Sequence, residues 1–79
     1  MSTITLDGLE PGSRAIIKGF AANGPARRRM AEMGLCPGTE IVTLRRAPLD
    51  DPIEFQVRGY NISLRKAEAA SIIVEIKEG

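Results

Sequence analysis

The side chains that could hold a metal ion are few, and most of them lie in one short stretch. Asp50, Asp51 and Glu54 offer carboxylate oxygens to a hard divalent cation, while Cys36 is the only thiol in a chain without histidine. Zinc and the later transition metals prefer imidazole and thiolate ligands, and a lone cysteine makes no chelate. Neighbouring carboxylates between prolines commonly form turns and stay solvated. We therefore expect no dedicated metal site and no bound cofactor.

Catalysis finds no better support in the residue types. Acid–base and nucleophilic catalysis need an activated group beside a base. The chain has no histidine, and none of its serines or carboxylates has an evident partner. Cys36 precedes a turn proline and is interpreted as a small filler of the core or its border. The sequence therefore predicts that the protein is not an enzyme.

The arginines at 27–29 are the charged feature that local structure explains least. They fall in the first half of a short predicted helix, where the helix macrodipole disfavours cations. One interpretation is a solvated helix face, with Arg28 paired to Glu32 one turn later. The other is a basic docking patch, extended by Arg45 and Arg46, that steers a partner with an acidic surface.

Residues 47–52, Ala-Pro-Leu-Asp-Asp-Pro, predict an exposed loop, because two prolines and two carboxylates do not suit a strand. Leu49 lies at its tip. It is either a scattered surface leucine or an anchor whose freedom is limited by Pro48 and Pro52. We favour the anchor. The candidate partner-binding residues are therefore Arg28, Arg29, Arg45, Arg46 and Leu49.

Charge and aromatic content bear on nucleic-acid binding. With 11 basic and 10 acidic residues the formal net charge is +1, which is not that of a polybasic binder. Phe20, Phe55 and Tyr60 are the only aromatic residues, and Phe55 belongs to a buried pattern, so no stacking platform is predicted. We expect a protein partner and no nucleic acid.

Length and cysteine content bound the rest. The chain of 79 residues forms one domain, residues 1–79, whose core supplies only about 3 to 5 kcal/mol, so a partner or a second copy would help. One cysteine permits no internal disulfide, and no signal peptide is evident, which indicates the cytoplasm. Aliphatic runs such as Ile72-Ile73-Val74 are far shorter than a membrane span.

The central stretch predicts a helix that ends and a strand that begins. The helix should start at Pro25, capped by Asn23 or Gly24, and stop where Gly34 takes a positive φ in a Schellman motif. Pro37 and Gly38 then fit a type II turn. The strand that follows, at 41–44, carries apolar or β-branched residues on both faces and is predicted to be buried on both sides.

The remaining elements alternate with turns. Residues 1–5 predict a frayed end or an edge, and Leu6 and Leu9 two apolar anchors around a turn. A second type II turn at Gly12 leads into a strand at 14–20. Alternation predicts strands at 53–58, 62–64 and 72–76, with a turn at Gly59 and a helical turn within 65–70. Five short strands and two short helices indicate a mainly β protein, a small barrel.

Three segments together are similar to one family. They are Arg-Arg-Arg-Met-Ala-Glu-Met-Gly-Leu-Cys-Pro-Gly-Thr at 27–39, Arg-Arg-Ala-Pro-Leu-Asp-Asp-Pro-Ile at 45–53 and Arg-Gly-Tyr-Asn-Ile-Ser-Leu-Arg-Lys-Ala-Glu-Ala at 58–69. In this order they resemble the FeoA family over nearly the whole chain. Asp50 departs from the resemblance, because similar sequences often carry glycine there, which puts the loop's backbone conformation in question.

The resemblance implies an SH3-like barrel that acts on FeoB, the GTP-hydrolysing ferrous iron transporter, and that is related to the C-terminal domain of DtxR-type iron-dependent repressors. We expect a small cytoplasmic adaptor or regulator of ferrous iron uptake, with iron itself bound only weakly. The alternative is a nucleic-acid-binding or repressor-associated barrel, and a third class is an enzyme fragment. Salt-dependent retention on nucleic acid separates the first two.

Overall fold

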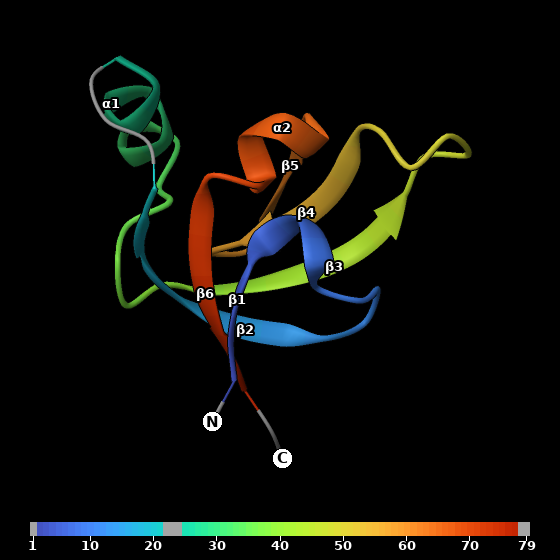
Figure 1. The fold of residues 1–79 in the computed structure, drawn as a ribbon, viewed down its shortest axis with the longest axis horizontal. Coiled ribbons are helices and arrows are strands. Elements are labelled where there is room, and N and C mark those ends of the chain that lie inside the picture. Colours follow the sequence, from blue (N-terminus) through green and yellow to red (C-terminus); the bar gives the residue numbers. More distant parts are fainter. Residues whose placement is uncertain (1, 22–24, 78–79) are drawn as a thin grey trace.

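The computed structural model of the chain describes residues 2–21 and 25–77. Its six strands form one antiparallel sheet in the order β1-β6-β2-β3-β4-β5, which curls around a single core (Figure 1). The elements in chain order are β1 (Thr3–Thr5), the 3-10 helix η1 (Leu6–Gly8), β2 (Arg14–Phe20), α1 (Pro25–Glu32), β3 (Glu40–Arg46), β4 (Ile53–Val57), β5 (Tyr60–Leu64), α2 (Lys66–Ala69) and β6 (Ile72–Ile76).

The strands follow the predicted alternation closely. In β4, Ile53, Phe55 and Val57 are buried, whereas Glu54 and Gln56 lie on the outer face. The core is built from such inward positions together with residues of η1, α1 and α2. It consists of Leu6, Leu9, Ala15, Ile17, Met30, Leu35, Ile41, Ile53, Phe55, Val57, Leu64, Ala69, Ile72 and Val74. The predicted mainly β barrel with two short helices is confirmed, and the N-terminal edge is a sixth, short strand.

One strand prediction was wrong. In β3 only Ile41 and Thr43 are fully buried, while Val42 and Leu44 on the other face are half-buried. The sheet is a single layer that wraps its own core, so its outer face remains open to solvent. Irregular registers between Ile17 and Gly19 and between Thr43 and Arg45 break the ladders locally, as β-bulges that curve a sheet do.

The end of α1 is the predicted Schellman motif. Leu35 N–H donates to the Met30 carbonyl at 3.0 Å, and Gly34 N–H donates to the Ala31 carbonyl at 3.0 Å, with Gly34 at φ +87°. The helix begins at Pro25, as predicted. The predicted cap at Asn23 or Gly24 lies outside the described residues.

The predicted turns have the expected backbone. Thr39 N–H donates to the Cys36 carbonyl at 3.1 Å across Pro37 and Gly38, and Gly38 has φ +93°. Gly12 and Gly59 also have positive φ, in the turns that lead into β2 and β5.

The two ends of the described chain lie side by side. Strand β1 pairs antiparallel with β6, so that Thr3 faces Glu75, and Ile76 N–H donates to the Ser2 carbonyl at 2.9 Å. In Figure 1 this end of the barrel lies opposite α1, α2 and the loop between β3 and β4.

Candidate functional site

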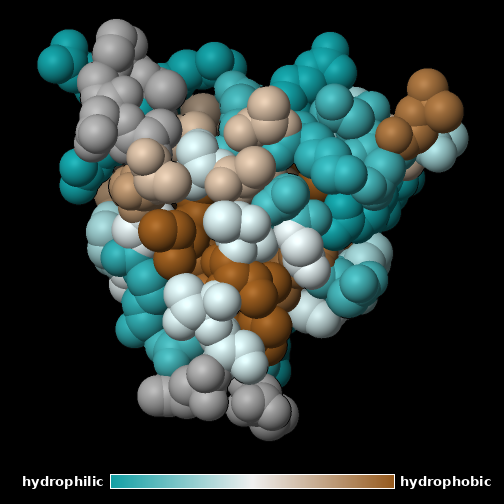
Figure 2. All heavy atoms as spheres, in the orientation of Figure 1, coloured by the Kyte–Doolittle hydropathy of each residue, from teal (hydrophilic) through white to brown (hydrophobic). Residues whose placement is uncertain are grey.

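The β3–β4 loop, residues 47–52, presents the most exposed large apolar side chain of the described chain. Leu49 is 90% exposed. In Figure 2 a hydrophobic tip protrudes at the upper right among hydrophilic atoms, where Figure 1 places this loop. Asp50 N–H donates to the Ala47 carbonyl at 2.7 Å, and Ala47 N–H donates to the Pro52 carbonyl at 3.0 Å. Leu49 is therefore carried by a hydrogen-bonded turn.

Asp50 adopts the positive φ that its position in the loop calls for, at +67°. Its carboxylate accepts hydrogen bonds from Lys66 Nζ and from Arg46, each at 3.0 Å. These two cations, Lys66 first, hold the pKa of Asp50 below its ordinary value. Aspartate is one of the few non-glycine residues that tolerate a positive φ. At this position the two ion pairs also hold the Asp50 side chain in place.

Asp51 ties the same loop to α2. Its Oδ1 accepts the backbone N–H of Lys66 at 3.0 Å, and Arg65 lies 3.9 Å from the same oxygen. The N–H of a first helical residue has no partner within its own helix. Asp51 supplies that partner from a segment distant in the sequence.

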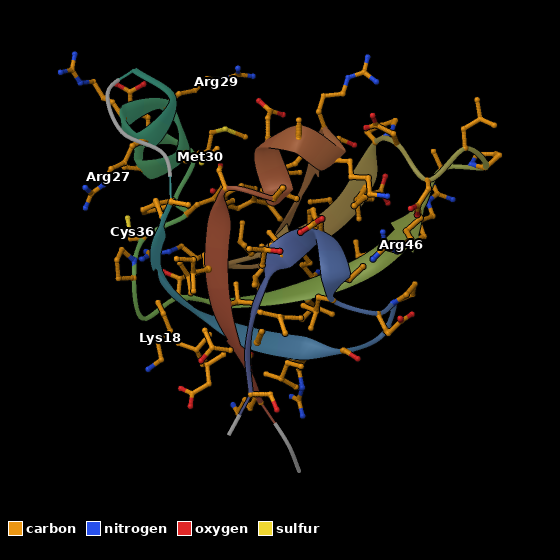
Figure 3. All side chains as sticks on the ribbon, in the orientation of Figure 1. Lys18, Arg27, Arg29, Met30, Cys36 and Arg46 are labelled. Atoms are coloured by element: carbon orange, nitrogen blue, oxygen red, sulfur yellow. The ribbon has the colours of Figure 1, made fainter. Side chains whose placement is uncertain are left out.

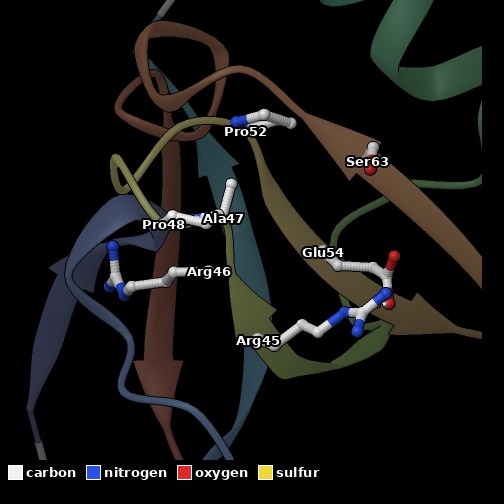
Figure 4. A pocket seen from close by; sticks show the side chains of 7 residues that line it. All are labelled: Arg45, Arg46, Ala47, Pro48, Pro52, Glu54 and Ser63. Atoms are coloured by element: carbon white, nitrogen blue, oxygen red, sulfur yellow. Dashed lines mark ion pairs between the residues drawn. The ribbon is translucent and has the colours of Figure 1, made fainter.

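Arg45 and Arg46 point to opposite sides of β3, as successive residues of a strand do (Figure 4). Arg46 donates to the carbonyls of Asp7 at 2.7 Å and Leu9 at 3.2 Å, and its side chain is only 20% exposed. Arg45 is exposed and pairs with Glu54 at 3.3 Å. The structure thus gives Arg46 an internal role, whereas Arg45 faces solvent.

A hollow of about 340 Å³ lies beside the loop on the outer face of the sheet (Figure 4). The Arg45–Glu54 ion pair lies at its edge. It is lined by Arg45, Arg46, Ala47, Pro48, Pro52, Glu54 and Ser63.

The arginines of α1 lie away from this loop. Arg27 and Arg29 lie at the left of Figure 3 and Arg46 at the right, with α2 between them in the ribbon. Arg27 lies over the Phe20 ring at 5.7 Å from its centroid, and Arg29 pairs with Glu68 of α2 at 3.3 Å. Arg46 therefore lies apart from the arginines of α1, with α2 between them.

Arg28 is the most available of the three. It is exposed, and within residues 2–21 and 25–77 no ion pair joins it to Glu32 or to any other carboxylate. Helix α1 contributes Met30 to the core, and just beyond its end Tyr60 donates its hydroxyl hydrogen to the Met33 carbonyl.

The carboxylates considered as metal ligands are occupied by cations. Asp50, Asp51 and Glu54 pair with Arg46, Lys66, Arg65 and Arg45. In the described part of the chain no three histidine, cysteine, aspartate or glutamate side chains gather as a metal site would need. Cys36 is half-buried beside the Ala31 carbonyl.

Sequence reasoning missed Arg65 and Lys66. It assigned them only to a helical turn, yet they border the loop and hold both of its aspartates. The available signal was a pair of aspartates in one segment and a pair of basic residues 15 positions later. Nothing in the sequence shows that these two pairs are in contact, because only the fold brings them together. No helix among the described residues is long and apolar enough to cross a membrane.

Comparison with known sequences finds one family. The FeoA domain model matches residues 4–76. Over 71 residues, 90% of this chain, the sequence is 39% identical to the Fe(2+) transport protein A/Fe(2+) transporter FeoB fusion protein of Porphyromonas gingivalis (strain ATCC BAA-308 / W83). The chain spans only 8% of the length of that protein.

Solved structures agree with the sequence match. The FeoA-like protein of Clostridium acetobutylicum superposes with a TM-score of 0.91 at 38% identity, covering 100% of this chain and 92% of that one. The FeoA of Stenotrophomonas maltophilia, described as a procaryotic SH3 domain protein and solved with zinc, gives 0.80 at 28% identity over 91% and 89% of the two chains. The predicted SH3-like barrel is confirmed.

The expected relation to metal-dependent repressors is a relation of fold. A manganese-dependent transcriptional repressor gives a TM-score of 0.85 at 17% identity, covering 95% of this chain and 42% of that one. The domain match across residues 4–76 goes further than shared shape: the chain belongs to the FeoA family.

Proposed function

We propose that the protein is a non-catalytic cytoplasmic adaptor that docks on the cytoplasmic part of a FeoB-type ferrous iron transporter and supports or regulates iron uptake. The observation that carries the proposal is the exposed Leu49 at the end of a loop whose backbone is hydrogen-bonded and whose Asp50 side chain is held by two cations. The Porphyromonas gingivalis relative supports the choice of partner, since there the two proteins share one chain. A tether raises the effective concentration of two domains that bind each other.

The candidate residues divide into an anchor and steering charges. The backbone at Leu49 loses little conformational freedom on binding, because the turn already holds it, so burial of the side chain in a partner has a reduced entropic cost. Arg28, Arg29 and Arg45 are exposed and can attract an acidic partner surface at a distance. Arg46 contributes by holding the loop and not by meeting the partner.

The experiment measures association and dissociation rates between the protein and purified cytoplasmic domains of the transporter. Leu49→Ala should weaken binding about tenfold, chiefly through faster dissociation, because it removes roughly 1 to 2 kcal/mol of apolar burial. The matched control is Leu49→Met, which keeps the apolar area and should bind like the wild type. Both variants should unfold at the wild-type denaturant concentration, since the side chain is 90% exposed.

A charge-reversal arm tests steering. Arg28→Glu should slow association and flatten its dependence on salt, with dissociation nearly unchanged. Arg28 is the cleanest position, because reversing Arg29 would also break its ion pair with Glu68.

Two results would count against the proposal. Wild-type protein that fails to bind the domains at about 100 μM would remove the transporter contact, and salt-dependent retention on nucleic acid would then favour the alternative barrel function. If the Leu49→Ala and Arg28→Glu variants both bind with wild-type rates, the contact with the transporter must lie on another face of the domain.

A further inference from the structure

We propose that α2 and the β3–β4 loop form one preassembled docking surface, in which Asp50 and Lys66 are positioning residues that set the direction of Leu49. The surface fits an apolar pocket bordered by carboxylates on the partner. This inference rests on the proposed function, because it names the surface and the partner chemistry of that same contact.

Asp50 lies at the centre of this surface. Its two carboxylate oxygens are divided between two elements: Oδ1 accepts from Arg46 of β3, and Oδ2 accepts from Lys66 of α2, each at 3.0 Å. The residue follows Leu49 directly and has a φ of +67°. A rotation of its backbone out of that region would therefore move both the carboxylate that makes these two ion pairs and the preceding Leu49.

A second contact doubles the link between loop and helix. The Lys66 backbone N–H donates to Asp51 at 3.0 Å, so Lys66 binds Asp50 through its side chain and Asp51 through its main chain. Arg65 lies 3.9 Å from Asp51 as well. Because α2 also contributes Ala69 to the core, the loop is joined to a seated element and not to a free side chain.

The charges around Leu49 indicate what the partner presents. Asp50 accepts through both of its carboxylate oxygens, and Asp51 through Oδ1, from donors within the chain. The side chains of Arg65, which lies near Asp51, and of Arg45, which precedes the loop in β3, are 69% and 77% exposed and retain free N–H groups. A surface that offers one leucine between outward donors is complementary to an apolar pocket with carboxylates at its border.

The test measures amide hydrogen exchange in the loop and binding to the transporter domains in the same variants. Asp50→Asn keeps the size and the tolerance of positive φ but loses the charge, and Lys66→Gln removes the cation from the other side. Each should lower the protection of the amide at position 50, which donates to the Ala47 carbonyl, against hydrogen exchange relative to its intrinsic rate. Each should also weaken binding to the transporter's cytoplasmic domains about fivefold.

A double-mutant cycle and a matched control sharpen the result. Asp50→Asn also loses the contact with Arg46, so if Lys66 acts through Asp50, the Asp50→Asn/Lys66→Gln variant should bind no more weakly than Asp50→Asn alone. The control is Glu40→Gln, which breaks an exposed ion pair of the same kind, Lys77 to Glu40 at 2.9 Å, at another place on the barrel. It should leave both loop exchange and binding unchanged.

The outcomes separate this inference from the proposed function. Absence of wild-type binding defeats the proposed function and the docking surface with it. Normal wild-type binding, weakened by Leu49→Ala but not by Asp50→Asn or Lys66→Gln, overturns the inference alone. Unchanged amide exchange in both positioning variants overturns it as well, and that measurement needs no partner.

Discussion

Among single residues, Thr43 stands out because its side chain is buried without a hydrogen bond. It lies fully buried in β3, and its hydroxyl has no partner among the described residues. An unsatisfied buried hydroxyl costs roughly 1 to 3 kcal/mol. Thr43→Val replaces the hydroxyl by a methyl group of similar shape and should raise the free energy of unfolding by about 1 kcal/mol, as measured by urea denaturation.

Thr39 provides the control for this experiment. It is also buried, but its hydroxyl oxygen accepts a hydrogen bond from Arg58 at 3.4 Å. Thr39→Val should therefore not raise the free energy of unfolding. A Thr43→Val protein that unfolds at lower urea than the wild type would show that the hydroxyl has a partner after all.

Gly34 is constrained twice. Its φ of +87° strains any side chain, and a Cβ atom there would lie 2.6 Å from the Tyr60 hydroxyl oxygen. Gly38 has a similar φ but open space around it. Gly34→Ala should lower the free energy of unfolding by about 2 kcal/mol or more, against about 1 kcal/mol for Gly38→Ala.

Tyr60→Phe separates the two constraints on Gly34. Removing the hydroxyl relieves the close contact, so the additional loss from Gly34→Ala should be smaller in a Tyr60→Phe background. Equal denaturation midpoints for wild type and Gly34→Ala would mean that the backbone relaxes at no cost.

The turn glycines could be predicted from the sequence because a positive φ depends on a few neighbouring residues. Arg46 could not be placed in the same way. Its carbonyl partners, Asp7 and Leu9, lie 39 and 37 residues away. Nothing local distinguishes an arginine that will reach them from its neighbour Arg45, which faces solvent.

At the scale of elements, the link between the loop and α2 should depend on pH. Lys66 and Arg46 lower the pKa of Asp50 in the folded protein from its ordinary value of 3.8. A depressed folded pKa contributes stability above pH 3.8, and that contribution disappears as pH falls through the lower folded value. The stability of wild type should therefore exceed that of Asp50→Asn at pH 7. The difference should begin to shrink near pH 3.8 and disappear once the pH is below the lower folded pKa.

Denaturation of both proteins in urea at a series of pH values measures this difference. Glu40 offers a comparison, because Lys77 lowers its pKa in the same direction. The contribution of Glu40 to stability should begin to decrease at a higher pH, near its ordinary pKa of 4.5. A difference between wild type and Asp50→Asn that persists at a pH below the lowered folded pKa of Asp50 would show that the asparagine perturbs the loop by shape and not by charge.

Periodicity predicted elements better than it predicted their surroundings. Strand β4 alternates as its sequence does, but Val42 and Leu44 made β3 look buried on both faces. A half-buried outer face of a single curled sheet accepts apolar residues as readily as a second core does. The same limit applies to α1 and the loop, whose separation in space is set by the strands between them.

For the whole molecule, α2 joins the two candidate contact regions. It binds α1 through Glu68 and Arg29, and it binds the loop through Lys66 and Asp50. The family resemblance predicted the barrel, because backbone shape is shared across the family. It did not predict this line of ion pairs, which depends on the particular residues that this chain carries at each position.

The pairing of β1 with β6 has a practical consequence for how the domain can be attached to something else. Ser2 and Ile76 lie together at the end of the barrel remote from α1, α2 and the β3–β4 loop (Figure 1). A linker, tag or neighbouring domain joined at either side of this pair therefore extends away from the candidate surface. The domain can be immobilised on a sensor, or joined to a membrane protein by a flexible linker, and its candidate contact surface stays accessible.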